Sequence, residues 1–89
     1  MSTFIISYDL NKPGQDYSSL YEEIKTLGSW RHNLDSTWVV NSSLSAEQIR
    51  DRLWAEMDNN DAILVAKSAG IGAWSGFDNS ASKWLKARL

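Results

Sequence analysis

The chain has no cysteine and only one proline, Pro13, among its 89 residues. Without cysteine it forms no disulfide and offers no thiolate ligand to a metal ion. Cysteine content therefore does not distinguish an oxidising from a reducing compartment. The first residues, MSTFIIS, contain neither a basic stretch nor a long apolar run. We therefore predict no signal peptide and no membrane-spanning helix, and expect a cytoplasmic protein.

An excess of positive charge is also lacking. Nine Lys and Arg residues stand against 11 Asp and Glu residues, which gives a net charge of -2. This balance provides no overall attraction to phosphate groups, so it argues against a protein that coats nucleic acid. Any contact with DNA or RNA has to be local.

The composition is that of a folded chain, with 43% hydrophobic and 22% charged residues. The length predicts a single domain over residues 1–89. A domain this small buries a limited share of its surface, and a second copy is one way to bury more. We therefore expect a homodimer.

Short apolar runs alternate with helical patterns along the chain. Residues 3–9 are rich in β-branched and aromatic side chains and stop before the turn at 11–14, so they predict a strand. Apolar residues from Tyr17 to Leu27 follow helical spacing, and Gly28 ends that helix. The remaining patterns predict strands over 30–33 and 36–41, a helix that begins at the capping box Ser45–Gln48, a strand over 62–67 and a short helix over 81–88.

This order predicts an α+β fold, a ferredoxin-like βαββαβ sandwich with a four-stranded antiparallel sheet and a short C-terminal helical extension. Side chains alternate along the first strand, so the bulkier row should lie under the two main helices and the row from Thr3 to Asp9 on an open face. The fourth strand is apolar on both faces, so we expect a second copy to cover the open face by sheet-face or edge pairing, in an interface that includes sheet residues and residues 70–89. The predicted core contains Phe4, Ile6, Leu20, Ile24, Leu27, Ile49 and Leu53.

Asp9 ends what is predicted to be a central strand. A twofold partner would bring two such carboxylates together, and this pair suits a hard cation that acts on phosphate, such as Mg²⁺ or Mn²⁺. The alternative is that Asp9 caps the turn that follows it. On residue type alone, turn capping is the commoner role.

Four segments of the chain, SYDL, WRHN, STWVV with SLS, and DNNDAILV, resemble in content and spacing the second core CRISPR-associated protein (Cas-two) family with its VapD and SinR-like relatives. Members are small ferredoxin-like homodimers, and in the nuclease members the aspartate that matches Asp9 is the metal ligand. The resemblance implies a metal-dependent endonuclease for DNA or RNA, with Asp9 as catalytic residue and ligand of Mg²⁺ or Mn²⁺. It also implies that Tyr8, Arg31 and Ser36 contact nucleic acid.

Two departures favour an alternative function. Val39 stands where nuclease members have glutamate, and residues 14–23 have none of their arginines. The alternative is a non-catalytic dimeric scaffold that binds nucleic acid or a partner protein. His32, the only histidine, could assist as a general base, but a structural role across the predicted hairpin is commoner.

The five tryptophans are many for this length. Packing explains Trp38 and Trp54 best, whereas Trp30, Trp74 and Trp84 could line a groove.

The last third of the chain holds two further features. The glycines of residues 70–76 let the chain turn and lay Trp74 and Phe77 on a neighbouring surface. Lys83, Lys86 and Arg88 form the only basic cluster, which we interpret as a solvated helix end because cations in a last turn complement the helix dipole.

Overall fold

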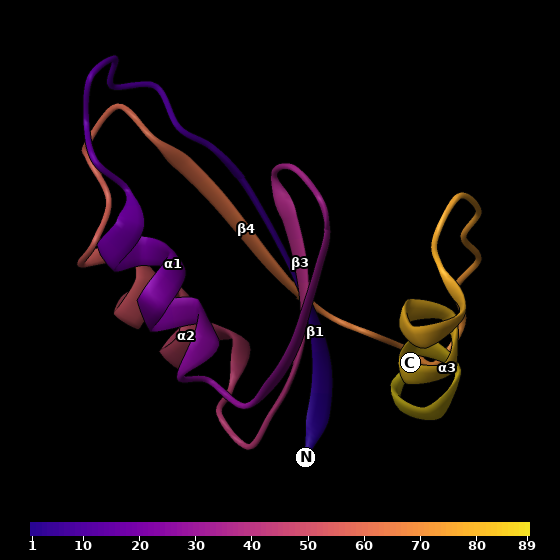
Figure 1. Cartoon of the computed structure of the whole chain (residues 1–89). Helices are drawn as coiled ribbons and strands as arrows, with labels where there is room; N and C mark the ends of the chain where they lie inside the picture. The colour runs from indigo at the N-terminus through magenta and orange to yellow at the C-terminus, as the bar shows by residue number, and fades with distance from the viewer.

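The protein, described here by a computed structural model of all 89 residues, is built on a four-stranded antiparallel sheet with α1 and α2 on one face and α3 on the other (Figure 1). The sheet order is β2-β3-β1-β4. This arrangement confirms the predicted ferredoxin-like α+β fold with its C-terminal helix. The strands are β1 (Ser2–Asp9), β2 (Ser29–Leu34), β3 (Thr37–Ser42) and β4 (Ala62–Lys67), and the helices are α1 (Ser18–Lys25), α2 (Ala46–Trp54) and α3 (Asn79–Arg88).

Local chemistry sets several of these boundaries. The predicted capping box starts α2: the Ser45 hydroxyl accepts from the Gln48 N–H at 3.1 Å, and the Gln48 side chain accepts from the Ser45 N–H at 2.9 Å. Asp78 starts α3 by accepting from the Ala81 N–H at 2.8 Å. Between α1 and β2, a Cβ at Gly28 would lie 2.0 Å from the Asn41 carbonyl oxygen, so only glycine fits there.

The core lies between the sheet and the pair α1 and α2. Phe4, Ile6 and Tyr8 are the β1 side chains that face these helices, and all three are buried. Each of the seven predicted core residues belongs to the same buried cluster, together with Trp38 and Val40 of β3. The assignment of the bulkier row of β1 to the core is therefore confirmed.

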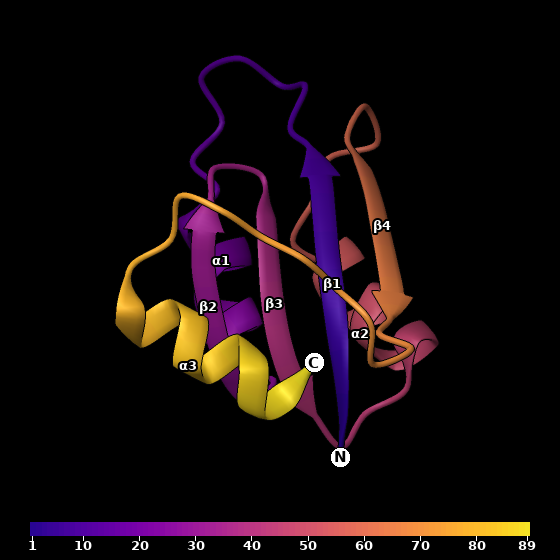
Figure 2. The ribbon, with the colours of Figure 1, turned by 90° about the vertical axis from the view of Figure 1, so that its right-hand side faces the viewer.

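The opposite side of the sheet, which we call the outer face, is not bare. After β4 the chain crosses this face, and α3 then runs over β2 and β3 towards the start of β1 (Figure 2). Trp84 and Leu85 of α3 are buried, and the Thr3 hydroxyl donates to the Arg88 carbonyl. The prediction of an open face was wrong for this half of the sheet, because the chain's own C-terminal segment covers it.

The other half of the outer face remains uncovered along β4. Leu64 is 63% exposed, and Ala62 and Ala66 on the same row are exposed as well. Trp54, at the end of α2, is 39% exposed and lies outside the core cluster, so its packing against a second copy stays a prediction. None of the three helices has the length and apolar character that crossing a bilayer requires.

The packing predicts a stability test. Ile24→Ala or Leu53→Ala removes a fully buried side chain and should lower the free energy of unfolding by about 2 to 5 kcal/mol, through lost burial and the cavity left behind. Urea unfolding followed by circular dichroism measures the change. The exposed Ser19→Ala in α1 is the control and should change the stability by no more than about 0.5 kcal/mol. Negligible losses at both core positions would contradict the helix assignment.

Candidate functional site

Asp9 is the last residue of β1 and lies on the outer face opposite Ala62 of β4. It is exposed, at the rim of a shallow hollow of about 220 Å³ that Ser7 and Leu64 also line. Its carboxylate takes part in none of the hydrogen bonds or ion pairs of the chain. The capping interpretation of Asp9 is therefore wrong, and the carboxylate is free to meet a ligand or a partner.

A different carboxylate, Asp61, organises this end of the sheet. One of its oxygens accepts from the Asn11 N–H at 2.7 Å and from the Tyr17 hydroxyl at 2.8 Å, and the other accepts from the Asp58 N–H at 2.8 Å. These bonds join the loop after β1, the start of α1 and the turn before β4. Asp61 is 6% exposed. This buried carboxylate, and not Asp9, therefore fixes the loop that follows β1.

The bonds to Asp61 set its protonation. Burial by itself would raise the pKa of this carboxyl, but the N–H groups of Asn11 and Asp58, the Tyr17 hydroxyl and the charge of Lys12 together hold the pKa below its ordinary value. Burial, reinforced by the bond to Asp61, raises the pKa of Tyr17. Asp61 is therefore an ionised structural residue.

Tyr8 and Trp38 form the centre of an aromatic cluster under β1 and β3. Tyr8 is 5% exposed, and its hydroxyl accepts from the Trp38 indole N–H at 3.0 Å. Burial raises the pKa of this hydroxyl. The structure gives Tyr8 a role in the core, and the contact between Tyr8 and nucleic acid stays a prediction.

His32 of β2 stacks on Trp38, with 3.9 Å between the ring centres and 10° between the ring planes. Its Nε2 lies 3.0 Å from the carbonyl oxygen of Asp35, across the β2–β3 turn. Both contacts fit the structural role that the sequence favours for this histidine. Ser36 is in the same turn, where its carbonyl accepts from the Tyr8 N–H at 3.1 Å and its side chain is exposed.

Arg31 lies away from Asp9. It is opposite Val39, which in turn is opposite Ile5, four residues before Asp9 along β1. The structure therefore brings Asp9, Tyr8 and Ser36 to one end of the sheet but leaves Arg31 at its middle.

Arg31 meets α3 instead. Its guanidinium carbon is 5.4 Å from the centre of a Trp84 ring, and that of Arg88 is 4.9 Å from the same ring. Arg31 also donates to the Trp30 carbonyl at 3.1 Å. Cation–π attraction thus holds two guanidinium groups beside one indole, although β2 and α3 are far apart in the sequence.

The paired and unpaired cations separate in space. The four ion pairs lie on α1, α2 and the loops at the Asp61 end of the sheet; they are Lys12–Asp58, Lys25–Glu22, Arg50–Asp51 and Arg52–Glu23. The remaining five of the nine cations have no carboxylate partner. Four of these five lie on or beside α3 and form what we call the basic surface: Arg31, Lys83, Lys86 and Arg88. The fifth, Lys67, ends β4.

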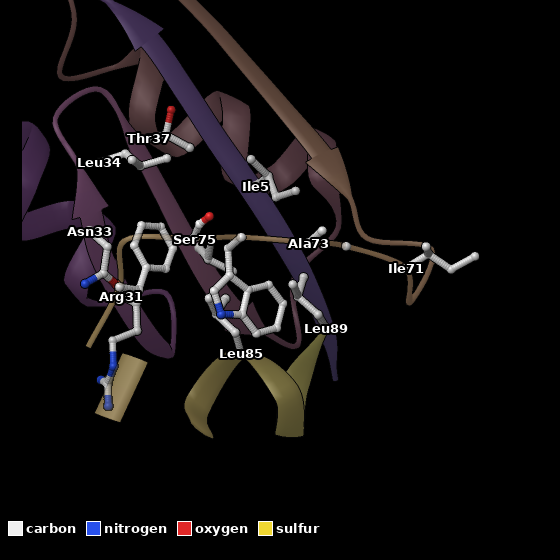
Figure 3. Close-up of a pocket in the computed structure, with 14 residues that line it drawn as sticks. Ile5, Arg31, Asn33, Leu34, Thr37, Ile71, Ala73, Ser75, Leu85 and Leu89 are labelled. Atoms are coloured by element: carbon white, nitrogen blue, oxygen red, sulfur yellow. The ribbon is translucent and has the colours of Figure 1, made fainter. Parts of the chain in front are cut away.

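An apolar groove of about 360 Å³ lies between the sheet and the C-terminal segment. Figure 3 shows Ile5 and Leu34 of the sheet on one side and Leu85 of α3 on the other. Trp74 and Phe77 also line the groove, and the Trp74 indole donates to the Ser82 hydroxyl at 3.1 Å. The predicted docking of Trp74 and Phe77 is confirmed, and the surface they contact belongs to the same chain.

The residues of one chain do not fit Mg²⁺ or Mn²⁺ on their own. No group of three or more His, Cys, Asp or Glu side chains is arranged to hold a metal ion. Asp9 offers a single carboxylate, and the hollow beside it adds no other acidic side chain. A metal site at Asp9 therefore requires a ligand from outside the chain, such as Asp9 of a second copy.

No family model matches the chain, and no solved structure matches it significantly. The resemblance to the Cas-two family stays a prediction that rests on the four segments named above.

Asp61 predicts a pH-dependent loss of stability. In Asp61→Asn one carboxylate oxygen becomes an NH₂ group that faces N–H or O–H donors, so the free energy of unfolding at neutral pH should fall. The folded pKa of Asp61 lies below the ordinary value of 3.8. Its ionised form therefore stabilises the fold above that pH, and this contribution is lost as the pH falls through the folded pKa. Urea unfolding curves of wild type and Asp61→Asn should converge in acid.

Asp9→Asn is the matched control, because it makes the same change at an exposed carboxylate without partners. It should leave the urea midpoint at neutral pH close to that of wild type. Equal losses for the two variants would contradict the different roles assigned to Asp9 and Asp61.

Proposed function

We propose that the protein is a small, non-catalytic homodimeric scaffold that binds nucleic acid through the basic surface on α3. The observation that carries this proposal is the separation of charge: the cations on α1 and α2 are neutralised by carboxylates, whereas those of the basic surface are not. With a net charge of -2, contact with phosphate has to be local, and this surface is where it is favourable.

The chemistry of the basic surface suits a phosphate backbone. Guanidinium groups present planar forks of N–H donors that match phosphate oxygens. Contact with Trp84 limits the freedom of Arg31 and Arg88 before a ligand arrives, so less side-chain entropy is lost on binding. Lys83 and Lys86 occupy exposed positions of α3 and add two point charges to the same helix.

The opposite side of the molecule helps to orient a ligand. Glu47 and Glu56, which lie on or next to α2 and have no cation partner, repel phosphate. A nucleic acid should therefore meet the α3 side, and affinity should depend on salt because binding releases counterions.

Charge reversal on α3 tests this proposal. Lys83→Glu combined with Lys86→Glu should weaken binding to labelled DNA or RNA at least tenfold at about 0.1 M salt, and should reduce the slope of log affinity against log salt by about 2. Fluorescence anisotropy with single- and double-stranded DNA and RNA, over about 50 to 200 mM salt, measures both quantities.

The matched control, Lys25→Glu combined with Arg50→Glu, changes the net charge by the same amount on the helix side. It should leave the affinity close to that of wild type. An equal loss in the two double variants would show that only total charge matters, and no binding by wild type would overturn the nucleic-acid proposal in favour of a protein ligand.

One observation favours a second candidate, a metal-dependent endonuclease. Asp9 is exposed at the end of a central strand and has no partner within the chain, as a shared metal ligand must be before its partner arrives. The resemblance to the Cas-two family supports this role, and the lack of other acidic groups beside Asp9 means that a second Asp9 would have to complete the site.

For this candidate, Asp9→Asn should abolish cleavage of DNA or RNA in Mg²⁺ or Mn²⁺ and leave the fold intact, because an amide keeps the shape of a carboxylate and loses its charge. Gel assays with wild type, Asp9→Asn and a chelator measure the effect. Asp35→Asn changes another exposed carboxylate at the same end of the sheet and should cleave like wild type. Cleavage that persists in Asp9→Asn or in chelator would rule this candidate out.

A further inference from the structure

We propose that β4 pairs edge to edge with β4 of a second copy, antiparallel and with Val65 opposite Val65 of the second copy, so that the two sheets become one. The inference rests on the proposed homodimer and specifies its interface. It follows from the hydrogen-bonding pattern of β4 and from the side chains at its free edge.

β4 is an edge strand without the features that usually protect one. Its pairing with β1 is unbroken from Ala62 to Lys67, its sequence AILVAK has no proline, and its one charge is at the end. The opposite edge, β2, has an irregular register between Arg31 and Leu34, and α3 lies on the β2 side of the sheet, away from β4 (Figure 2). Edges that lack bulges, prolines and central charges are open to pairing with another strand.

The backbone bonds show which groups of β4 are free. The Ser68 N–H donates to the Thr3 carbonyl at 2.8 Å, and the Tyr8 N–H donates to the Ser36 carbonyl at 3.1 Å. In an antiparallel ladder, residues bonded to one neighbour alternate with residues that point the other way. Even-numbered residues of β4 therefore bond to β1, and the N–H and C=O groups of Ile63, Val65 and Lys67 point to the free edge.

These free groups pair in the largest number in one register. They are centred on Val65, so a twofold axis at Val65 places it opposite its own copy and places Ile63 opposite Lys67 of the second copy. Each such pair exchanges two N–H···O bonds, and opposed side chains share a face. A shift by one residue would oppose residues of different faces and leave the free groups without partners.

The side chains favour a second copy over an unrelated strand. Lys67 has no carboxylate partner in its own chain, and its position on the helix side places it next to Ile63 of the second copy. Ile63 lies in a hollow together with the exposed Trp54 and the Arg50–Asp51 ion pair. Lys67 thus gains an aromatic neighbour, and Leu64, 63% exposed, gains Ala66 of the second copy on the outer face.

The edge dimer fits the scaffold and excludes the paired-Asp9 endonuclease. Both α3 helices would lie on the same face of the joined sheet, so the two basic surfaces could meet one nucleic acid. Asp9 is opposite Ala62, so the two Asp9 residues would be about 14 Å apart across the strands and roughly 20 Å apart along them. A metal ion cannot bridge carboxylates at that separation.

Single cysteines test the register, because the chain has none of its own. In the proposed dimer the two Cα atoms at residue 65 are about 5.5 Å apart, within the range of a disulfide. Val65→Cys should therefore form a disulfide-linked dimer on mild oxidation. Ile63→Cys or Lys67→Cys alone should not, since their copies are about 14 Å apart, but an equal mixture of these two variants should. Ser80→Cys on α3 is the exposed control, and thermal unfolding of each reduced variant verifies its fold.

The outcomes separate the alternatives. Sedimentation of wild type as a monomer at micromolar concentration would overturn the proposal, as would equal cross-linking at residues 63 and 65. Cross-linking of Asp9→Cys without Val65→Cys would assign the dimer to the Asp9 end instead. The affinities of the monomer and of the cross-linked dimer for nucleic acid are measured separately. A monomer that binds would support the basic surface independently of the interface. A cross-linked dimer that does not bind would overturn the scaffold proposal and leave the interface proposal intact.

Discussion

The central position of β1 constrains the rest of the molecule, because a strand paired on both sides has two rows of side chains and both need cover. The row with Phe4, Ile6 and Tyr8 receives it from α1 and α2. The row from Thr3 to Asp9 receives it only in part, where α3 closes over Thr3. The half under α3 buries Trp84 and Leu85 and carries the basic surface, and the uncovered half, along β4 and around Asp9, leaves a strand edge and a carboxylate without partners.

Electrostatics distinguishes the side of α1 and α2 from the side of α3. Around α1, α2 and the Asp61 end, cations are matched by carboxylates and a buried carboxylate is matched by donors. On α3 and at the end of β4 the cations are unmatched. Groups that serve the fold are thus satisfied within the chain, while four of the five unmatched cations lie on or beside α3. This arrangement supports the proposed scaffold, in which a polyanion contacts the α3 side and α1 and α2 remain in water.

Most of the architecture could be predicted from local patterns, because strand alternation, helical spacing and the Ser45 capping box act over a few residues. The errors concern contacts between distant residues. Tyr17 and Asp61 are 44 positions apart, and nothing in the local DNND sequence distinguishes the buried Asp61 from the half-buried Asp58. Helical spacing also does not show that Trp54 lies in a hollow beside Ala62 and Ile63 of β4, where it is 39% exposed. The meeting of Arg31 with Trp84 depends on where α3 docks, which periodicity does not determine.

The cover that α3 gives to β1 has a consequence for synthesis on the ribosome. The Thr3 hydroxyl and the Arg88 carbonyl that it binds are separated by 85 positions, so β1 is synthesised well before the helix that closes over it. β1 also waits for β4 before its second edge is paired. Until α3 is made, Ile5 and Val39 of the apolar groove have no cover from it. Such late closure is typical of folds whose contacts are distant in sequence, and it exposes apolar surface during synthesis.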